Sequence, residues 1–258
     1  MPRFAANLTM MFTEVPFLER FAAARRAGFE AVEFQRPYAW PIDEVRHAQR
    51  ESGLECVLMN TPSGDWDGGE RGLACLPGRE AEFRDGVETA VAYAVALGIK
   101  NLHATAGIAT GNRAACEAVY LDNLRWAANC VNSHGITLLI EPISQRAFPG
   151  YLLTTLVQAA ESCAQVNAAN LRIQIDCFHL QMSEGNVTNQ VRKYLPECGH
   201  IQIAGVPDRH EPDEGELRYE HVFALLDEWD YKGWVGCEYM PKGNTEAGLK
   251  WFEPWRSK

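Results

Sequence analysis

The stretch Leu171-Arg-Ile-Gln-Ile-Asp-Cys-Phe-His179 decides the fold class. Leu171, Ile173 and Ile175 alternate with polar residues, which is the two-residue period of a β-strand. The strand ends on the carboxylate of Asp176, and the imidazole of His179 follows three residues later. An acid and a histidine at the end of a strand indicate chemistry, provided that other strands bring matching groups to the same place.

Outward from this stretch, one pattern recurs along the chain. A glycine closes a helix-like stretch and leads into a strand-like run at five positions, which are Gly28, Gly53, Gly98, Gly135 and Gly233. Glycine readily ends a helix in the left-handed conformation. Strands that alternate with helices in this way predict parallel β/α units.

The pattern predicts eight strands, at residues 3–7, 31–34, 55–60, 101–104, 137–141, 171–176, 200–204 and 233–238. It predicts eight helices, at residues 16–27, 41–52, 78–97, 114–134, 155–166, 189–194, 219–229 and 245–255. Eight of each in 258 residues is typical of a (β/α)₈ TIM barrel. Because no linker-like stretch interrupts the pattern, we expect an α/β fold in which residues 1–258 form a single TIM-barrel domain.

Composition excludes several classes of partner. The chain has 24 Lys and Arg against 34 Asp and Glu, a net charge of −10, which repels a phosphate backbone, so we expect no nucleic-acid partner. None of the eight cysteines forms a Cys-x-x-Cys pair, as expected of reduced thiols. No apolar run is long enough for a signal peptide or a membrane span. We therefore expect a cytoplasmic protein with no membrane partner.

A polar residue stands at or near the carboxyl end of every predicted strand: Asn7, Glu33, Asn60, His103, Glu141, Asp176, Gln202 and Glu238. In a TIM barrel these ends converge on the face that carries the active site. The eight residues therefore predict one polar pocket. Contact with solvent is the alternative explanation for Asn7, Glu33 and Asn60 taken singly.

Two of these residues, Glu141 and Glu238, follow apolar runs that look buried on both sides. An unpaired carboxylate is costly in such a place, and a shared cation relieves the cost. The carboxylates of Glu141, Asp176 and Glu238 and the amide oxygen of Gln202 predict a site for Mg²⁺ or Mn²⁺, because these metals prefer oxygen ligands. Buried salt bridges to Arg or Lys are the alternative.

The same four residues, together with the run Gln202-Ile-Ala-Gly-Val-Pro-Asp-Arg-His-Glu-Pro-Asp-Glu-Gly-Glu216, resemble the hydroxypyruvate isomerases of the xylose isomerase-like superfamily. The segments at residues 3–14 and 76–80 are similar too. The resemblance implies that Glu141, Asp176, Gln202 and Glu238 bind a divalent metal. It assigns the acid/base work to Glu141 and Glu238, and it implies a small 2-oxo or hydroxy acid as substrate.

These residue types suit the reaction that the resemblance implies. Interconversion of hydroxypyruvate and tartronate semialdehyde moves a proton between neighbouring carbons through an enediolate. A metal between the two substrate oxygens stabilises the negative charge, and a carboxylate on either side can remove and return the proton. Which of Glu141 and Glu238 is the base stays open.

Other side chains are candidates for binding the substrate. His179 would hydrogen-bond a substrate oxygen, and Arg209 would pair with the substrate carboxylate. The alternatives are a structural histidine in the barrel wall and a salt bridge from Arg209 within its own loop. His103 and Asn7 would line the pocket.

The glycine-rich loop at residues 60–72 is too long for an ordinary connection. It predicts a cover that excludes water, with Trp66 closing on the substrate. A contact between subunits explains the loop equally well, and Trp251 and Trp255 near the C-terminus leave a homo-oligomer open.

Several rival functions compete with this hypothesis. A 2-oxo-tetronate isomerase would use the same residues on a substrate with one more carbon. A ketose epimerase of the superfamily usually has a histidine in place of Gln202. Asp208-Arg-His210 resembles a zinc-binding motif of apurinic endonucleases, but the further histidines of such a site are missing and the net charge opposes DNA. A non-catalytic binding protein would not need two carboxylates and a metal.

Overall fold

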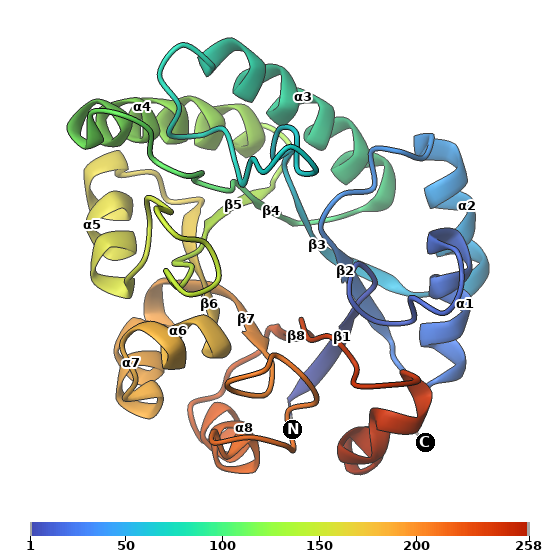
Figure 1. The fold of residues 1–258 in the computed structure, drawn as a ribbon. Coiled ribbons are helices and arrows are strands. Elements are labelled where there is room, and N and C mark those ends of the chain that lie inside the picture. The colour runs from blue at the N-terminus through green and yellow to red at the C-terminus, as the bar shows by residue number, and fades with distance from the viewer. Residues whose placement is uncertain (1, 257–258) are drawn as a thin grey trace.

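The computed structural model describes residues 2–256. Eight parallel strands close into a barrel in chain order, and the last strand pairs with the first (Figure 1). The strands are β1 (Arg3–Asn7), β2 (Ala31–Phe34), β3 (Glu55–Asn60), β4 (Asn101–His103), β5 (Thr137–Ile140), β6 (Leu171–Asp176), β7 (Cys198–Ile203) and β8 (Trp234–Cys237). The predicted (β/α)₈ TIM barrel is confirmed.

Helices surround the barrel on its outside (Figure 1). They are α1 (Phe17–Arg26), α2 (Ile42–Ser52), α3 (Glu80–Leu97), α4 (Arg113–Asn132), α5 (Leu156–Val166), α6 (Cys177–Ser183), α7 (Val187–Tyr194) and α8 (Tyr219–Glu228), with the 3₁₀ segments η1 (Leu195–Glu197) and η2 (Glu246–Trp255). Within residues 2–256, no helix combines the length and the apolar character that a membrane crossing requires. All eight cysteines are free thiols, as predicted.

The repeated helix ends follow the predicted chemistry, with one exception. Gly53 and Gly98 end α2 and α3 in the left-handed conformation, with φ of 67° and 73°. The prediction is wrong at Gly233, which does not adopt a positive φ. After α8 the chain instead turns at Asp230, with φ of 59°, because aspartate tolerates the left-handed region better than most residues.

Two helical segments differ from the prediction. Residues 245–255 are not one α-helix, since η2 is 3₁₀ and kinked at Leu249, as expected of a segment that contains Pro254. The sequence prediction also missed α6, which follows β6 without a loop. Asp176 begins α6 by accepting a hydrogen bond from Phe178 N at 2.8 Å, the usual role of an N-cap aspartate.

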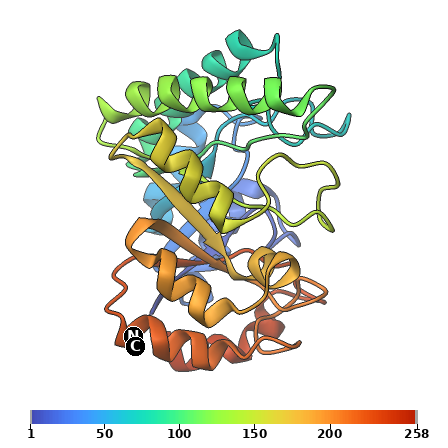
Figure 2. The same cartoon turned by 90° about the vertical axis from the view of Figure 1, so that its left-hand side faces the viewer.

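Two apolar regions hold the barrel together and place the polar residues. The large core lies between the strands and the helices. A separate small cluster consists of Ala5, Ala31, Val57, Leu58 and Leu139. Because side chains alternate along a strand, Asn7 and Glu33 share the interior face with Ala5 and Ala31. The loops after β3 and β5 project from the same end of the barrel (Figure 2).

Candidate active site

One group of polar side chains inside the barrel, here called the Glu33 network, is held together by hydrogen bonds. Glu33 Oε1 accepts from Asn7 Nδ2 at 3.0 Å and from Gln202 Nε2 at 2.7 Å. Its Oε2 lies 2.7 Å from His200 Nε2. Gln174 Nε2 donates to Gln202 Oε1 at 2.6 Å. Because a carboxylate only accepts hydrogen bonds, Glu33 suits all three donors.

The neighbouring strand β8 leaves room for the Glu33 carboxylate. A Cβ atom added to Gly236 would lie 2.2 Å from Glu33 Oε2, which is closer than any non-bonded contact. Gly236 is paired with Gln202 on β7, so the gap lies beside another member of the network. Only glycine fits this position while Glu33 keeps its hydrogen bonds.

A second group, here called the carboxylate cluster, contains Glu141, Asp176 and Glu238. Arg209 Nη2 donates to Asp176 Oδ2 at 3.0 Å and to Glu238 Oε2 at 2.5 Å. Its Nη1 lies 2.8 Å from His179 Nε2. The three carboxylate residues are buried, and the Arg209 side chain is 13% exposed. One guanidinium thus faces three carboxylates.

Burial in the first place, and neighbouring negative charge in the second, raise the pKa values of the cluster. Burial, with Arg209 opposing it, raises the pKa of Glu238 to about 7. Burial first, and then Glu238 and Asp176, raise the pKa of Glu141 well above its ordinary range. Burial also raises the pKa of Asp176 against the effect of Arg209. Fully ionised, the cluster needs more positive charge than Arg209 supplies.

Several buried atoms beside the cluster have no hydrogen-bond partner. Glu141 Oε1 and both ring nitrogens of His103 are unpartnered, and His103 Nδ1 lies 3.6 Å from Glu141 Oε2. Burial, followed by the effect of His200, lowers the pKa of His103 to about 3. Burial and then Arg209 lower the pKa of His179. Both histidines are therefore neutral at pH 7.

The donor set fits a divalent cation. Glu141, Asp176 and His179 each offer a ligand atom, and these atoms lie within 4.8 Å of one another. Buried carboxylates with raised pKa values and an unpartnered Glu141 Oε1 are what a cation would neutralise. The sequence prediction placed His179 with the substrate, whereas the structure places it among these possible ligands. Gln202 lies in the Glu33 network, and its role as a ligand stays a prediction.

The remaining predicted substrate residues differ in their distance from the cluster. Asn7 connects the two groups, because its Nδ2 also donates to Glu238 Oε1 at 3.2 Å. Arg209 has a φ of 60°, an uncommon conformation for a residue other than glycine. Trp66 packs edge-on against Phe148, with ring centroids 5.8 Å apart. Its closure on a substrate stays a prediction.

Sequence reasoning missed three residues that hold the site. Gln35 Nε2 donates to Glu238 Oε1 at 2.8 Å, and no pattern in the sequence points to it. The two-residue period of the strands could have identified Gln174 and His200. Each stands two residues before a predicted site residue and therefore shares its face.

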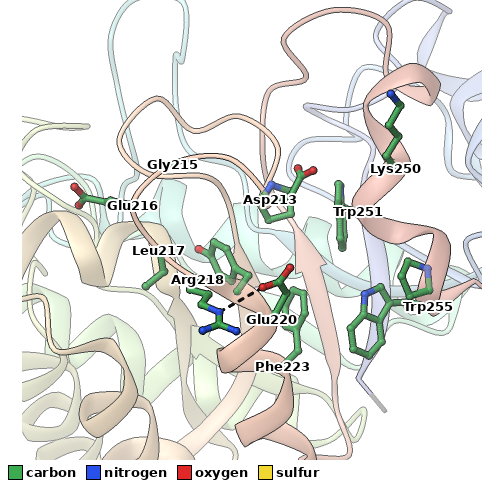
Figure 3. A pocket seen from close by; sticks show the side chains of 13 residues that line it. Asp213, Gly215, Glu216, Leu217, Arg218, Glu220, Phe223, Lys250, Trp251 and Trp255 are labelled. Atoms are coloured by element: carbon green, nitrogen blue, oxygen red, sulfur yellow. Dashed lines mark hydrogen bonds and ion pairs between the residues drawn. The ribbon is translucent and has the colours of Figure 1, made fainter.

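A cavity of about 470 Å³ lies on the outside of the barrel, between the loop before α8 and η2. Figure 3 shows Trp251 and Trp255 on one side of it and the Arg218–Glu220 ion pair on the other. None of the carboxylate cluster lines this cavity. The predicted self-association through these tryptophans stays a prediction.

Comparison with known proteins agrees with the fold and with the resemblance. Over 257 residues and 99% of both chains, the protein is 50% identical to the 2-oxo-tetronate isomerase of Cupriavidus necator. Over 258 residues, 99% of this chain and 100% of the relative, it is 46% identical to the hydroxypyruvate isomerase of Escherichia coli. A crystal structure described as AP endonuclease, family 2, from Brucella melitensis has a TM-score of 0.98 at 49% identity, with 100% of both chains covered.

These relatives confirm the resemblance to the hydroxypyruvate isomerases and their 2-oxo-tetronate counterparts. Residues 21–255 match the family model described as xylose isomerase-like TIM barrel, which agrees with the closed barrel seen in the structure. The chain belongs to the xylose isomerase-like TIM barrel family.

Proposed function

We propose that this protein is a hydroxypyruvate isomerase, which interconverts hydroxypyruvate and tartronate semialdehyde through an enediolate. The observation that carries the proposal is the carboxylate cluster. Glu141 and Glu238 follow two different strands, β5 and β8, and both are buried with raised pKa values. The name of the relative from Escherichia coli supports the same reaction.

Glu141 and Glu238 supply the proton transfers in this proposal. A general base works best when its pKa lies near the working pH, and in the metal-free protein burial raises the pKa of Glu238 to about 7. One glutamate removes the proton beside the carbonyl, and the other, which starts protonated, gives its own proton to the neighbouring carbon, while the hydroxyl proton moves from one substrate oxygen to the other. Because the reaction runs both ways, the glutamate that accepts the proton in one direction donates it in the other.

The residues around the glutamates position them and the cofactor. Glu141, Asp176, Gln202 and Glu238 are the proposed ligands of Mg²⁺ or Mn²⁺, and His179 lies beside the first two. When bound, the cation supplies positive charge that stabilises the enediolate. Asn7, Gln35 and Arg209 hold the Glu238 carboxylate by hydrogen bonds. His103 and Asn7 are proposed to line the pocket, and Trp66 to cover it.

A 2-oxo-tetronate isomerase is the second candidate, because the relative from Cupriavidus necator bears that name at 50% identity. Both candidates use the same proton transfer and differ by one carbon of the substrate. The net charge of −10 argues against DNA as a substrate. The eight free thiols agree with the proposed cytoplasmic location.

Turnover in heavy water tests the proposal. Protein stripped with a chelator receives Mg²⁺ or Mn²⁺, and proton NMR follows hydroxypyruvate and 2-oxo-tetronate side by side. We expect isomerisation of one substrate only after metal is restored, with deuterium entering at the carbon that receives the proton. Folded, metal-loaded protein that turns over neither substrate would contradict the proposal.

A further inference from the structure

The rim of the barrel carries an unusual arrangement of two arginines, here called the Arg36–Trp66–Arg71 stack. The guanidinium carbon of Arg36 lies 3.9 Å from the centroid of the Trp66 ring, and that of Arg71 lies 4.2 Å from it. Arg71 also lies 5.3 Å from the centroid of the Phe148 ring. Cation–π attraction holds guanidinium groups against indole rings, but two cations beside one ring repel each other.

The two arginines differ in their hydrogen bonds. Arg71 Nη1 donates to the carbonyl oxygens of Trp66 at 2.9 Å and of Glu70 at 2.8 Å, so Arg71 fastens the loop that carries the tryptophan. Within residues 2–256, Arg36 forms neither a side-chain hydrogen bond nor an ion pair, although it is half-buried. A guanidinium offers five N–H donors, and those of Arg36 are left for a ligand.

The stack lies at the end of the barrel that carries the carboxylate cluster. Arg36 directly follows Gln35, whose side chain donates to Glu238 Oε1 at 2.8 Å. Trp66 belongs to the loop after β3, and Phe148 belongs to the loop after β5 that also carries Glu141. These two loops project from the same end of the barrel (Figure 2). The stack is therefore part of the rim over the site.

An anionic substrate needs a cation that Arg209 does not supply. Arg209 is already hydrogen-bonded to Asp176 and Glu238 and contacts His179. The carboxylate cluster repels a second anion, and so does the net charge of −10. Arg36 is a half-buried cation at the same rim, and no carboxylate among the described residues lies within ion-pair distance of it. Burial and the nearby Arg71 lower the pKa of Arg36, with Asp67 opposing them.

We propose that Arg36, held flat against Trp66, binds the carboxylate of the 2-oxo acid substrate, and that Arg71 positions Trp66 for this purpose. This inference rests on the proposed function and adds to it the group that selects acids over neutral sugars. A planar guanidinium can meet a carboxylate with two parallel hydrogen bonds. In this proposal Arg209 stays hydrogen-bonded to the carboxylates of the cluster and does not bind the substrate carboxylate, which was its role in the sequence prediction.

The test compares KM with kcat for the substrate that the metal-loaded enzyme turns over. Charge-assisted hydrogen bonds contribute enough that Arg36→Gln should raise KM about 10- to 100-fold, while kcat stays within about threefold, because the lost contact is the same in ground state and transition state. Arg36→Lys keeps the charge without the planar pair and should give an intermediate KM. Arg125→Gln removes an arginine that pairs with Asp122 on the outer helix α4 and controls for net charge.

The outcomes distinguish binding of the substrate carboxylate by Arg36 from a role in which the stack only holds the loop of Trp66 over the site. If the stack only keeps water out, Arg36→Gln lowers kcat, leaves KM unchanged and increases exchange of solvent deuterium into the substrate. That result, or wild-type values of both constants, would overturn the proposal. Wild-type protein without turnover on either acid would instead refute the proposed function. Thermal unfolding of each variant verifies that the barrel is intact.

Discussion

The Glu33 network and the carboxylate cluster lie in the same barrel, yet Glu33 and Glu141 differ in how their carboxylate oxygens are hydrogen-bonded. In the network, both oxygens of Glu33 accept hydrogen bonds from Asn7, Gln202 and His200. In the cluster, Glu141 Oε1 has no hydrogen-bond partner, and neither do the ring nitrogens of the neighbouring His103. Buried polar groups are normally satisfied, and those left unsatisfied need a separate explanation.

This difference indicates that the Glu33 carboxylate stabilises the fold, whereas the Glu141 carboxylate serves the reaction. A fully hydrogen-bonded carboxylate stabilises the fold, and its removal leaves donors unpaired. A buried carboxylate with a raised pKa lowers the stability of the metal-free fold, because its charge is poorly compensated. We therefore expect substitutions in the two groups to separate stability from turnover.

The largest effect should come from the glutamates of the cluster. Glu141→Gln and Glu238→Gln remove a group that moves the proton, and each should lower kcat by roughly 10²–10⁴-fold. The fold should be retained, as circular dichroism and gel filtration would verify. Exposed Glu161 on α5 offers the control Glu161→Gln. Turnover near the wild-type rate in both cluster variants would show that Glu141 and Glu238 do not transfer the proton.

The next effect concerns the pH dependence of stability in metal-free protein. The folded-state pKa of Glu238 is about 7, against an ordinary value of 4.5, so the folded state holds a proton that the unfolded chain releases. This contribution to stability is complete below the unfolded pKa and is lost as pH rises through about 7, a difference of roughly 3 kcal/mol. Urea unfolding at about pH 5 and about pH 8 should show a smaller loss in Glu238→Gln.

Metal binding should restore the stability that the metal-free protein loses as the pH rises. A cation that binds only the folded state, at about 100 times its Kd, adds about 2.7 kcal/mol to the free energy of unfolding. Differential scanning calorimetry with Mg²⁺ or Mn²⁺ should show this gain in the wild type and a smaller gain in Asp176→Asn. An equal gain in both proteins would place the metal elsewhere.

A smaller effect is expected when the network is altered. Glu33→Gln replaces one carboxylate oxygen by an NH₂ group, which cannot accept a hydrogen bond from the donor that it faces. The loss should lower the free energy of unfolding by roughly 1–3 kcal/mol. The kcat should fall less than in Glu141→Gln, because Glu33 is not itself hydrogen-bonded to a carboxylate of the cluster and is linked to Glu238 through Asn7. If Glu33→Gln lowered kcat as much as Glu141→Gln does and did not lower stability, the distinction between the network and the cluster would be wrong.

The sequence predicted the barrel and the three carboxylates of the cluster, because both depend on regular spacing. Strand period and strand ends were enough to find Glu141, Asp176 and Glu238. Strand ends also predicted that Asn7, Glu33 and Gln202 share one pocket. The hydrogen bonds that join them to Gln174 and His200 were not predicted, because they depend on contacts across the barrel: Glu33 contacts His200, which is 167 residues away in the sequence. The gap at Gly236 and the free donors of Arg36 likewise appear only when distant strands and loops meet.

The most direct test measures unfolding and turnover on the same variant, Glu141→Gln, beside wild type and Glu161→Gln. The account predicts that metal-free Glu141→Gln unfolds in urea with a free energy at least equal to that of the wild type, while its metal-restored turnover is lower by orders of magnitude. A variant that is clearly less stable than the wild type and still turns over substrate would contradict the claim that Glu141 is kept for chemistry.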